Sequence, residues 1–409
     1  MIKKLAACVG EYKKFAIATP FIMLGEAVMD IVLPLIMANM IDYGIQAKDM
    51  GYTIRMGLLM ILCTLFALIC GAGGGITAAH AATGFAKNLR AKLFKKVQTF
   101  SFSNIDRFST ASLVTRLTTD VTNTQNAFQM LIRMAVRSPV MLIGAAIMAI
   151  RINPELSAIF LVVIPILGIS LFLIMSKAHP RFEAMMEKYD ALNNSVQENL
   201  SAIRVVKAFV REDYEDKKFK NSADNVRRAQ LFAEKLVILN SPIMQLCMYG
   251  CILAVLWFGG NMVIGGTFEI GKLSSFISYV TQTLMSLMML SMVIMMITVS
   301  LASMHRIVEV LDEEPDLKED ADPVMEVKDG SIEFNHVDFS YSGKTDNLIL
   351  KDINLSIKSG ETIGVIGGTG SAKSTLVQLI PRLYDIEGGE IKVGGVNVRK
   401  YDTEVLRNQ

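Results

Sequence analysis

The chain has 409 residues, of which 52% are hydrophobic, and it contains 26 methionines. Its mean hydropathy of +0.40 is above what a soluble domain needs to fill a core, so the composition favours a membrane protein. The 41 basic and 39 acidic residues leave a net charge of only +2, which gives no broad basic field of the kind that nucleic-acid binding requires.

Six apolar segments reach or approach the length of about 20 residues that a helix needs to cross a bilayer. We therefore expect a six-helix transmembrane domain over residues 1–312, in a multi-pass protein of the cell membrane that contacts the lipid bilayer. The expected spans are roughly 15–40, 56–82, 134–150, 156–176, 236–258 and 273–300.

Two carboxylates interrupt the first span. Glu26 and Asp30 lie one helical turn apart, so they share a face of the helix inside the membrane. Because a carboxylate is costly in hydrocarbon, this face should meet a polar cavity or a polar partner. Two roles stay open: cation recognition or proton coupling in a substrate cavity, and a structural hydrogen bond to a neighbouring helix.

The connections between the spans differ in length and charge. The long connections, 83–133 and 177–235, are rich in lysine and arginine and keep the helical apolar periodicity of the spans. The short connections near 41–55, 151–155 and 259–272 carry few basic residues. The periodicity predicts helices that project beyond the bilayer, and the positive-inside rule predicts that both termini and both long connections are cytoplasmic.

The last span carries a row of methionines at helical spacing. Flexible, polarizable methionine suits a surface that accepts varied apolar ligands, and plain packing between helices explains the same spacing. A substrate cavity and a helix contact are therefore both open for this row. Its members are Met285, Met288, Met289, Met292, Met295 and Met296.

The composition changes after the last span. Acidic residues together with Pro315 and Pro323 predict a linker over residues 313–330. The stretch "SIEFNHVDFSYS" then alternates as a strand does. We expect a second domain of the α/β class over residues 331–409.

The stretch "ETIGVIGGTGSAKSTLVQLI" in this second domain fits the phosphate-loop pattern G-x-x-x-x-G-K-[ST]. An apolar strand is expected over Thr362–Ile366, then a glycine-rich turn, then a helix from about Lys373. Gly367, Lys373 and Ser374 are in register, whereas Ala372 occupies the position of the second glycine. The alternative is an ordinary glycine-rich turn between a strand and a helix.

A phosphate loop binds nucleotide through backbone N–H groups at the start of a helix. Lys373 should reach the β and γ phosphates of ATP, and the Ser374 hydroxyl should bind Mg²⁺. Ala372 should be tolerated, because helical backbone angles are expected there and its N–H is kept. The residues expected to bind ATP in this segment are Gly367, Gly368, Thr369, Gly370, Ser371, Ala372, Lys373, Ser374 and Thr375.

Six spans with long helical extensions, followed by "VDFSYSGKTDNLILKDINLSIKSGETIGVIGGTGSAKSTLVQLIPRLYDIEGGEIKVGGVNV", resemble a half-transporter of the ATP-binding cassette (ABC) exporter family, of the multidrug or lipid type. The resemblance covers essentially the whole chain. It implies that Tyr341 stacks on adenine, since a flat ring can cover the base; a strand tyrosine with a satisfied hydroxyl is the alternative. It also implies that segments 106–121 and 195–212 carry the two coupling helices, with solvated amphipathic helices as the alternative.

The family pattern continues with a glutamine loop, an LSGGQ signature, a catalytic glutamate and a switch histidine. None of these appears by Gln409, and Gln409 follows "DTEVLRN" too closely to be the glutamine of that loop. We therefore expect an incomplete nucleotide-binding domain with no catalytic residue and no ATPase activity of its own. The full-length parent would be a transporter ATPase.

The resemblance implies ATP-driven export of small amphipathic or hydrophobic substrates. A second half-transporter, identical or different, would complete a dimer, and the nucleotide-binding domain would lie in the cytoplasm. Two other classes stay open. One is a membrane subunit of a heterodimer that binds nucleotide without hydrolysing it, and the other is a phosphate-loop enzyme fused to an unrelated membrane anchor.

Overall fold

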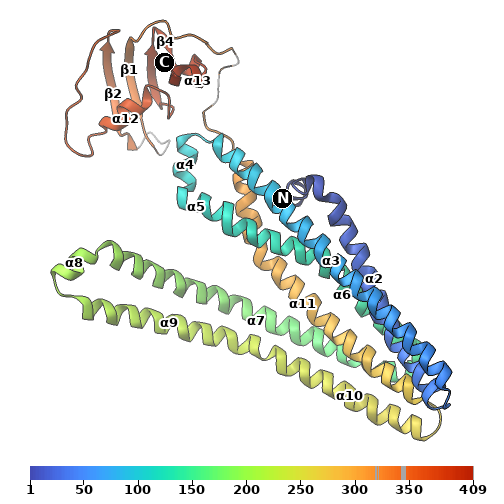
Figure 1. The fold of residues 1–409 in the computed structure, drawn as a ribbon. Coiled ribbons are helices and arrows are strands. Elements are labelled where there is room, and N and C mark those ends of the chain that lie inside the picture. The colour runs from blue at the N-terminus through green and yellow to red at the C-terminus, as the bar shows by residue number, and fades with distance from the viewer. Residues whose placement is uncertain (318–319, 321, 342–346, 409) are drawn as a thin grey trace. The chain divides into compact units, whose positions relative to one another are not determined.

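The computed structural model describes the chain except for residues 318–319, 321, 342–346 and 409. Gln409 and part of the predicted linker therefore lie outside the described residues. The helices are α1 (Ile2–Ala7), α2 (Lys13–Asn39), α3 (Met50–Gln98), α4 (Phe102–Phe108), α5 (Thr110–Thr115), α6 (Val121–Ile152), α7 (Pro154–Ser201), α8 (Ile203–Ala208), α9 (Glu212–Ile238), α10 (Asn240–Ile264), α11 (Ile270–Asp312), α12 (Lys373–Leu379) and α13 (Thr403–Asn408) (Figure 1). The strands are β1 (Ile332–Phe339), β2 (Leu350–Ile357), β3 (Gly388–Val393) and β4 (Val396–Asn397).

Within the described residues, six helical segments are long and apolar enough to cross a membrane. Each of them contains one of the spans predicted from hydropathy, which confirms the six-helix membrane domain. The segments are Gly10–Ile45, Met50–Gln98, Thr110–Ile152, Pro154–Ser201, Glu212–Ile264 and Ile270–Asp312.

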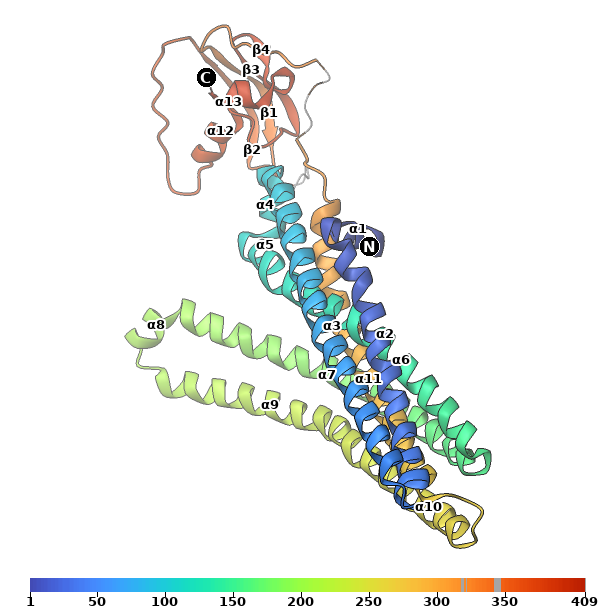
Figure 2. The ribbon, with the colours of Figure 1, turned by 45° about the vertical axis from the view of Figure 1, so that its right-hand side comes forward.

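The helices are longer than a bilayer requires. Helix α3 has 49 residues and α7 has 48, so each extends about 70 Å at the rise of an α-helix. The hydrocarbon core of a bilayer is only about 30 Å thick. The apolar periodicity of the long connections thus continues as helix, and both views show α7 running beside α9 and α10 (Figures 1 and 2).

The chain divides into two compact units. One unit joins the ends of several long helices to the α/β segment, and the other holds the apolar parts of the membrane helices. The first unit comprises Met1–Glu11, Thr83–Asn126 and Val299–Gln409, and the second comprises Tyr12–Ala82 and Ala127–Thr298.

The core of the second unit forms where α6, α7, α10 and α11 meet. Phe276 of α11 is fully buried, and its ring lies 6.0 Å from that of Phe160 on α7. Ala145 and Ala149 of α6 are also fully buried in this core. Small side chains let membrane helices approach closely, so packing holds this part of the bundle together.

The α/β segment of the first unit is built on a four-stranded antiparallel sheet with the order β2-β1-β3-β4. Phe334 of the central strand β1 lies opposite Leu355 of β2 and Ile391 of β3. Leu379 of α12 is buried against the same core. The strand-like alternation after Ser331 therefore forms a strand, and the helix predicted from Lys373 begins at that residue.

The strand predicted over Thr362–Ile366 is not formed. Residues 361–368 have no regular secondary structure, and the Ile366 side chain is 97% exposed. A strand needs a neighbour to pair with its N–H and C=O groups. Among the described residues, the sheet places no strand beside this segment, so its apolar side chains alone do not make it a strand.

Candidate functional site

Lys373, the first residue of α12, folds back over the glycine-rich turn. Its Nζ donates hydrogen bonds to the carbonyl oxygens of Gly367 at 2.9 Å and Gly368 at 2.7 Å. The Ser371 hydroxyl also donates to the Gly368 carbonyl, at 2.9 Å. Lys373 and the exposed Ser374 line an open pocket of about 400 Å³. The ammonium group of Lys373 therefore lies on the glycine-rich turn, beside the start of α12.

Ala372 does not have the helical backbone angles that we expected. Its φ is 59° and its ψ is 21°, which is the left-handed region. An alanine costs about 1–2 kcal/mol there, because its Cβ crowds the following carbonyl. The same residue packs against the hydrophobic core of the α/β segment. Alanine at this position therefore strains the backbone and also adds a contact with the core. The expectation that residue 372 has helical backbone angles is wrong.

Tyr341 lies beside α12. Its hydroxyl forms a 2.9 Å hydrogen bond with Oγ1 of Thr375. Its ring meets those of Phe339 and Tyr384 edge-on, with centroids 4.9 and 5.0 Å away. The structure thus joins two of the residues predicted to bind ATP, and it leaves 45% of Tyr341 exposed while Thr375 is buried.

In the second unit, both predicted carboxylates of α2 bind one arginine of α6. Nη2 of Arg137 lies 3.2 Å from Oε1 of Glu26 and 2.8 Å from Oδ2 of Asp30. The expected shared face of Glu26 and Asp30 is confirmed, since the two groups meet the same partner. Arg137 was not predicted as a site residue, although it is the single charged residue within the third predicted span, 134–150, and could have been noticed for that reason.

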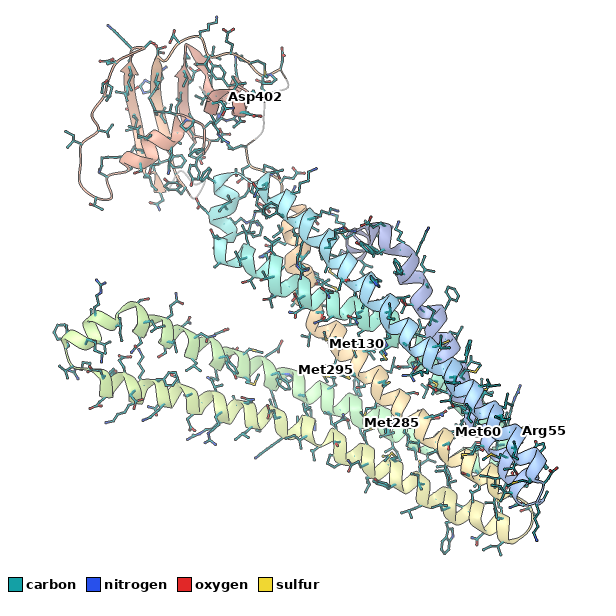
Figure 3. All side chains as sticks on the ribbon, viewed as in Figure 1. Arg55, Met60, Met130, Met285, Met295 and Asp402 are labelled. Atoms are coloured by element: carbon teal, nitrogen blue, oxygen red, sulfur yellow. The ribbon has the colours of Figure 1, made fainter. Side chains whose placement is uncertain are left out.

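Asp30 and Arg137 line a cavity of about 480 Å³ with residues of α11. Met285 and Met289 of the predicted row line it too, and so does Gln282. Figure 3 shows Met285 and Met295 along α11. Of the remaining methionines, Met288, Met292 and Met295 have exposed side chains, and Met296 is half-buried. The structure therefore places Met285 and Met289 in one cavity lining with Asp30, whereas Glu26 and the other four methionines do not line this cavity.

Short helices occupy both segments that resemble coupling regions. Helices α4 and α5 and the π-helical turn Arg116–Asp120 overlap residues 106–121, and α8 lies within 195–212. In the first unit, the Tyr384 hydroxyl donates a 2.8 Å hydrogen bond to Oδ2 of Asp106 on α4. Burial and this bond raise the pKa of Tyr384. Tyr384 was not predicted as a functional residue, because it carries no motif signal of its own.

Ion pairs fix the same segment to α11. Arg306 pairs with the buried carboxylate of Asp120, and Arg116 lies 2.8 Å from Glu309. A guanidinium that meets a carboxylate with two nitrogens holds it in one geometry. These pairs attach the π-helical turn Arg116–Asp120 to α11.

The fold and the two sites define a class: a membrane protein with six spanning helices joined to a phosphate-loop segment. The profile of the ABC transporter transmembrane region matches residues 16–288, and the ABC transporter profile matches residues 350–409. The chain therefore belongs to the ABC transporter family. It is an exporter half with a transmembrane region and part of an ABC ATPase domain.

Bacterial relatives support the same assignment. The chain is 35% identical to an uncharacterized ABC transporter ATP-binding protein, YfiB, of Bacillus subtilis, over 100% of this chain and 71% of the relative. It is 28% identical to an ATP-dependent lipid A-core flippase of Desulfotalea psychrophila, over 79% of this chain and 56% of the relative. It is 27% identical to a putative multidrug export ATP-binding/permease protein, YgaD, of Bacillus subtilis, over 100% of this chain and 72% of the relative.

Proposed function

We propose that this chain is one half of a dimeric exporter that uses ATP to move small amphipathic or hydrophobic substrates across the cell membrane. The cavity beside α11 carries the proposal, because Asp30, Arg137 and Gln282 face the same space as Met285 and Met289. Such a mixed lining suits a molecule with one polar and one apolar part. A lipid flippase and a putative multidrug exporter among the relatives are compatible with that substrate class.

The phosphate-loop residues fit ATP and Mg²⁺. Lys373 already places its ammonium group on neutral carbonyl oxygens of the turn, and charged phosphate oxygens are stronger acceptors for it. The Ser374 side chain is exposed and available as an oxygen ligand. When bound, Mg²⁺ would neutralise phosphate charge. The half-exposed ring of Tyr341 offers a face for adenine.

Transport requires that nucleotide binding reach the membrane helices. In this proposal α4, α5 and α8 act as the coupling helices, and a second half-transporter supplies the other cavity wall and the other cassette. The hydrogen bond between Tyr384 and Asp106 and the ion pairs to α11 support a rigid connection. The proposal places the N-terminus and the α/β segment in the cytoplasm.

ATP hydrolysis needs residues that position water and complete the sandwiched site. Residues 1–409 by themselves contain the phosphate loop but no segment that resembles the signature, the catalytic glutamate or the switch histidine. Membranes that contain only these residues should therefore release no phosphate above background. Vanadate-sensitive release from them would contradict this assignment of roles.

Export is tested in inverted membrane vesicles that contain the whole gene product, because residues 1–409 alone are predicted not to hydrolyse ATP. With ATP, the vesicles should accumulate an amphipathic fluorescent dye, and Lys373→Ala should abolish the accumulation. Lys358→Ala serves as the matched control, because it removes an exposed ammonium group of the same α/β segment and leaves the glycine-rich turn unchanged. If ATP binds but no transport or hydrolysis occurs, the protein is the non-hydrolysing subunit of a heterodimer, and the proposed turnover is wrong.

A further inference from the structure

The first residues of the predicted linker are hydrogen-bonded to α4. Nδ2 of Asn104 donates to Oε1 of Glu313 at 3.0 Å and to the carbonyl oxygen of Glu314 at 3.2 Å. The Ser103 hydroxyl donates to Oδ2 of Asp316 at 2.7 Å. All of these residues belong to the first unit. The chain therefore stays on α4 after α11 has ended.

Asn104 also holds the start of its own helix. Its Oδ1 accepts hydrogen bonds from the N–H of Ser101 at 3.1 Å and from the Ser101 hydroxyl at 2.6 Å, and that hydroxyl accepts the N–H of Asn104. This arrangement is a capping box, which satisfies N–H groups at a helix start. Asn104 is only 1% exposed. Because an amide has two N–H donors and an oxygen acceptor, one buried side chain serves both the helix start and the linker.

Neighbouring contacts hold the same stretch more weakly. Nη1 of Arg107 lies 2.8 Å from Oε1 of Glu313, and Lys4 of α1 pairs with Asp312, the last residue of α11. The basic side chains of both pairs are more than half exposed, so water screens them and each pair contributes little. A buried amide that donates to a carboxylate contributes more. Asn104 is therefore the residue on which the position of the linker depends most.

Three parts of the first unit meet beside Asn104. The Tyr384 hydroxyl joins the α/β segment to Asp106 of α4, and ion pairs attach the turn Arg116–Asp120 to α11. The linker joins the same α11 to the α/β segment through the chain itself. A rigid connection passes on a rigid-body motion, whereas a slack linker absorbs part of it. A linker that is bound to α4 therefore gives the α/β segment, α4 and α11 a common attachment.

We propose that Asn104 positions the linker, so that α4, the end of α11 and residues 313–316 move as one body during transport. The two N–H groups of its amide are the donors that fix the linker. Asn104 lies just before the segment 106–121 that resembles a coupling region, so the inference adds a residue to that region. It rests on the proposed export function.

Asn104→Asp separates the two roles of this side chain. Aspartate keeps an oxygen acceptor for Ser101 and is favourable in the first turn of a helix, so α4 should stay folded. Its carboxylate has no N–H donor and repels that of Glu313. In the whole gene product in lipid nanodiscs, without nucleotide, amide hydrogen exchange of residues 313–317 should become at least about tenfold faster, roughly 1.4 kcal/mol. Exchange in α4 should not change.

Glu313→Gln in the Asn104→Asp chain is the matched rescue. The glutamine amide donates to the new carboxylate, which restores the hydrogen bond in the reverse direction, so most of the lost protection of residues 313–317 should return. Asn221→Asp adds the same charge at an exposed position of α9 and should leave this exchange unchanged. The inference is overturned if Asn104→Asp does not alter the exchange of residues 313–317, or if α4 loosens as much as the linker does.

Transport measurements test the role of this position in coupling. In inverted vesicles, Asn104→Asp should lower the dye accumulated per ATP hydrolysed at least about fivefold, and Glu313→Gln should restore that ratio. The affinity for a fluorescent ATP analogue should stay the same, because the phosphate loop is not altered. An unchanged ratio together with faster linker exchange would overturn this inference alone. If the parent itself moves no dye, the export function fails, and the exchange measurement still decides whether Asn104 positions the linker.

Discussion

Ala372 shows how a single methyl group acts on two energies at once. At φ 59° the alanine is strained relative to glycine, by about 1–2 kcal/mol. Its methyl group packs against the core of the α/β segment, which contributes about 0.8 kcal/mol if the group is fully buried. Glycine would also make the unfolded chain more flexible. These contributions nearly cancel, so we expect the alanine to change the stability of the segment little.

We predict that Ala372→Gly changes the affinity for a fluorescent ATP analogue by less than about tenfold, roughly 1.4 kcal/mol. The N–H of residue 372 survives the change, and the methyl group contacts the core of the segment. Lys373→Ala should weaken binding far more, because it removes the cation that lies on the turn. Titration of both variants checks the prediction. If Ala372→Gly creates binding where the parent shows none, the parental site is degenerate.

The sequence predicted the types of the site residues better than their surroundings. Glu26 and Asp30 could be assigned to one helix face, because the spacing of an α-helix is fixed. Their partner Arg137 lies 107 residues beyond Asp30, and the pattern within one helix does not specify which other helix faces it. The left-handed backbone of Ala372 was missed for a related reason, since the packing of the α/β segment sets that angle and alanine itself favours another.

The start of helix α11 is hydrogen-bonded to a carboxylate at the end of the first membrane helix. Asp42 accepts hydrogen bonds from the backbone N–H groups of Gly271 at 2.6 Å and Lys272 at 3.2 Å. A carboxylate at a helix start satisfies unpaired N–H groups and interacts well with the helix dipole. Gly271 has no room for a side chain: a Cβ there would lie 2.6 Å from Oδ2 of Asp42 and still closer to the Ala38 carbonyl oxygen.

We predict that Gly271→Ala destabilises the membrane domain by about 1–3 kcal/mol, the usual cost of overpacking. Gly57→Ala is the matched control, because Gly57 also lies in a membrane helix and a Cβ there meets nothing within 4 Å. The control should be neutral or stabilise the helix by up to about 1 kcal/mol. Apparent unfolding temperatures in detergent distinguish the two. Equal shifts for both variants would show that the contact of Gly271 with Asp42 and Ala38 is not tight in the protein.

The hydrogen bond between Tyr384 and Asp106 joins the α/β segment to α4. We predict that Tyr384→Phe loosens α4, because a hydrogen bond of this kind contributes about 1 kcal/mol. Amide hydrogen exchange in α4 should become roughly fivefold faster. Tyr249→Phe removes the hydroxyl of an exposed tyrosine on α10 and should leave α4 unchanged. Unaltered exchange in the Tyr384 variant would mean that the hydrogen bond is dispensable and that the contact of the Tyr384 ring with the Phe102 ring of α4, 6.0 Å between centroids, is enough to hold α4.

Elements whose backbone N–H and C=O groups form hydrogen bonds within one segment were predicted well. A membrane helix forms all its hydrogen bonds within one segment, so hydropathy located six spans that the structure contains. Helix α12 begins at the predicted Lys373 for the same reason. The apolar run Thr362–Ile366 has the composition of a strand, but strand pairing depends on another segment of chain. No part of the described sheet pairs with it, and its own residues did not reveal that.

The arrangement of all six spans across the membrane follows from charge rather than from apolar length. Hydropathy alone fits either orientation, because a span is equally apolar from both sides. Lysine and arginine are concentrated in residues 83–133 and 177–235, and basic residues are retained on the cytoplasmic side. We therefore expect both long connections to be cytoplasmic, and with an even number of spans we expect both termini to lie on that side as well.

Cysteine labelling tests this orientation. We predict that a membrane-impermeant thiol reagent added to intact cells modifies Lys48→Cys but not Lys217→Cys, in a background in which the five native cysteines are replaced. Lys48 lies in the short connection between α2 and α3, Lys217 lies in α9, and both side chains are exposed. Permeabilised cells supply the control, since both positions should then react at similar rates. If the reagent labels position 217 but not position 48 in intact cells, the true topology is the reverse of the predicted one. The phosphate loop would then face the exterior, where ATP is scarce.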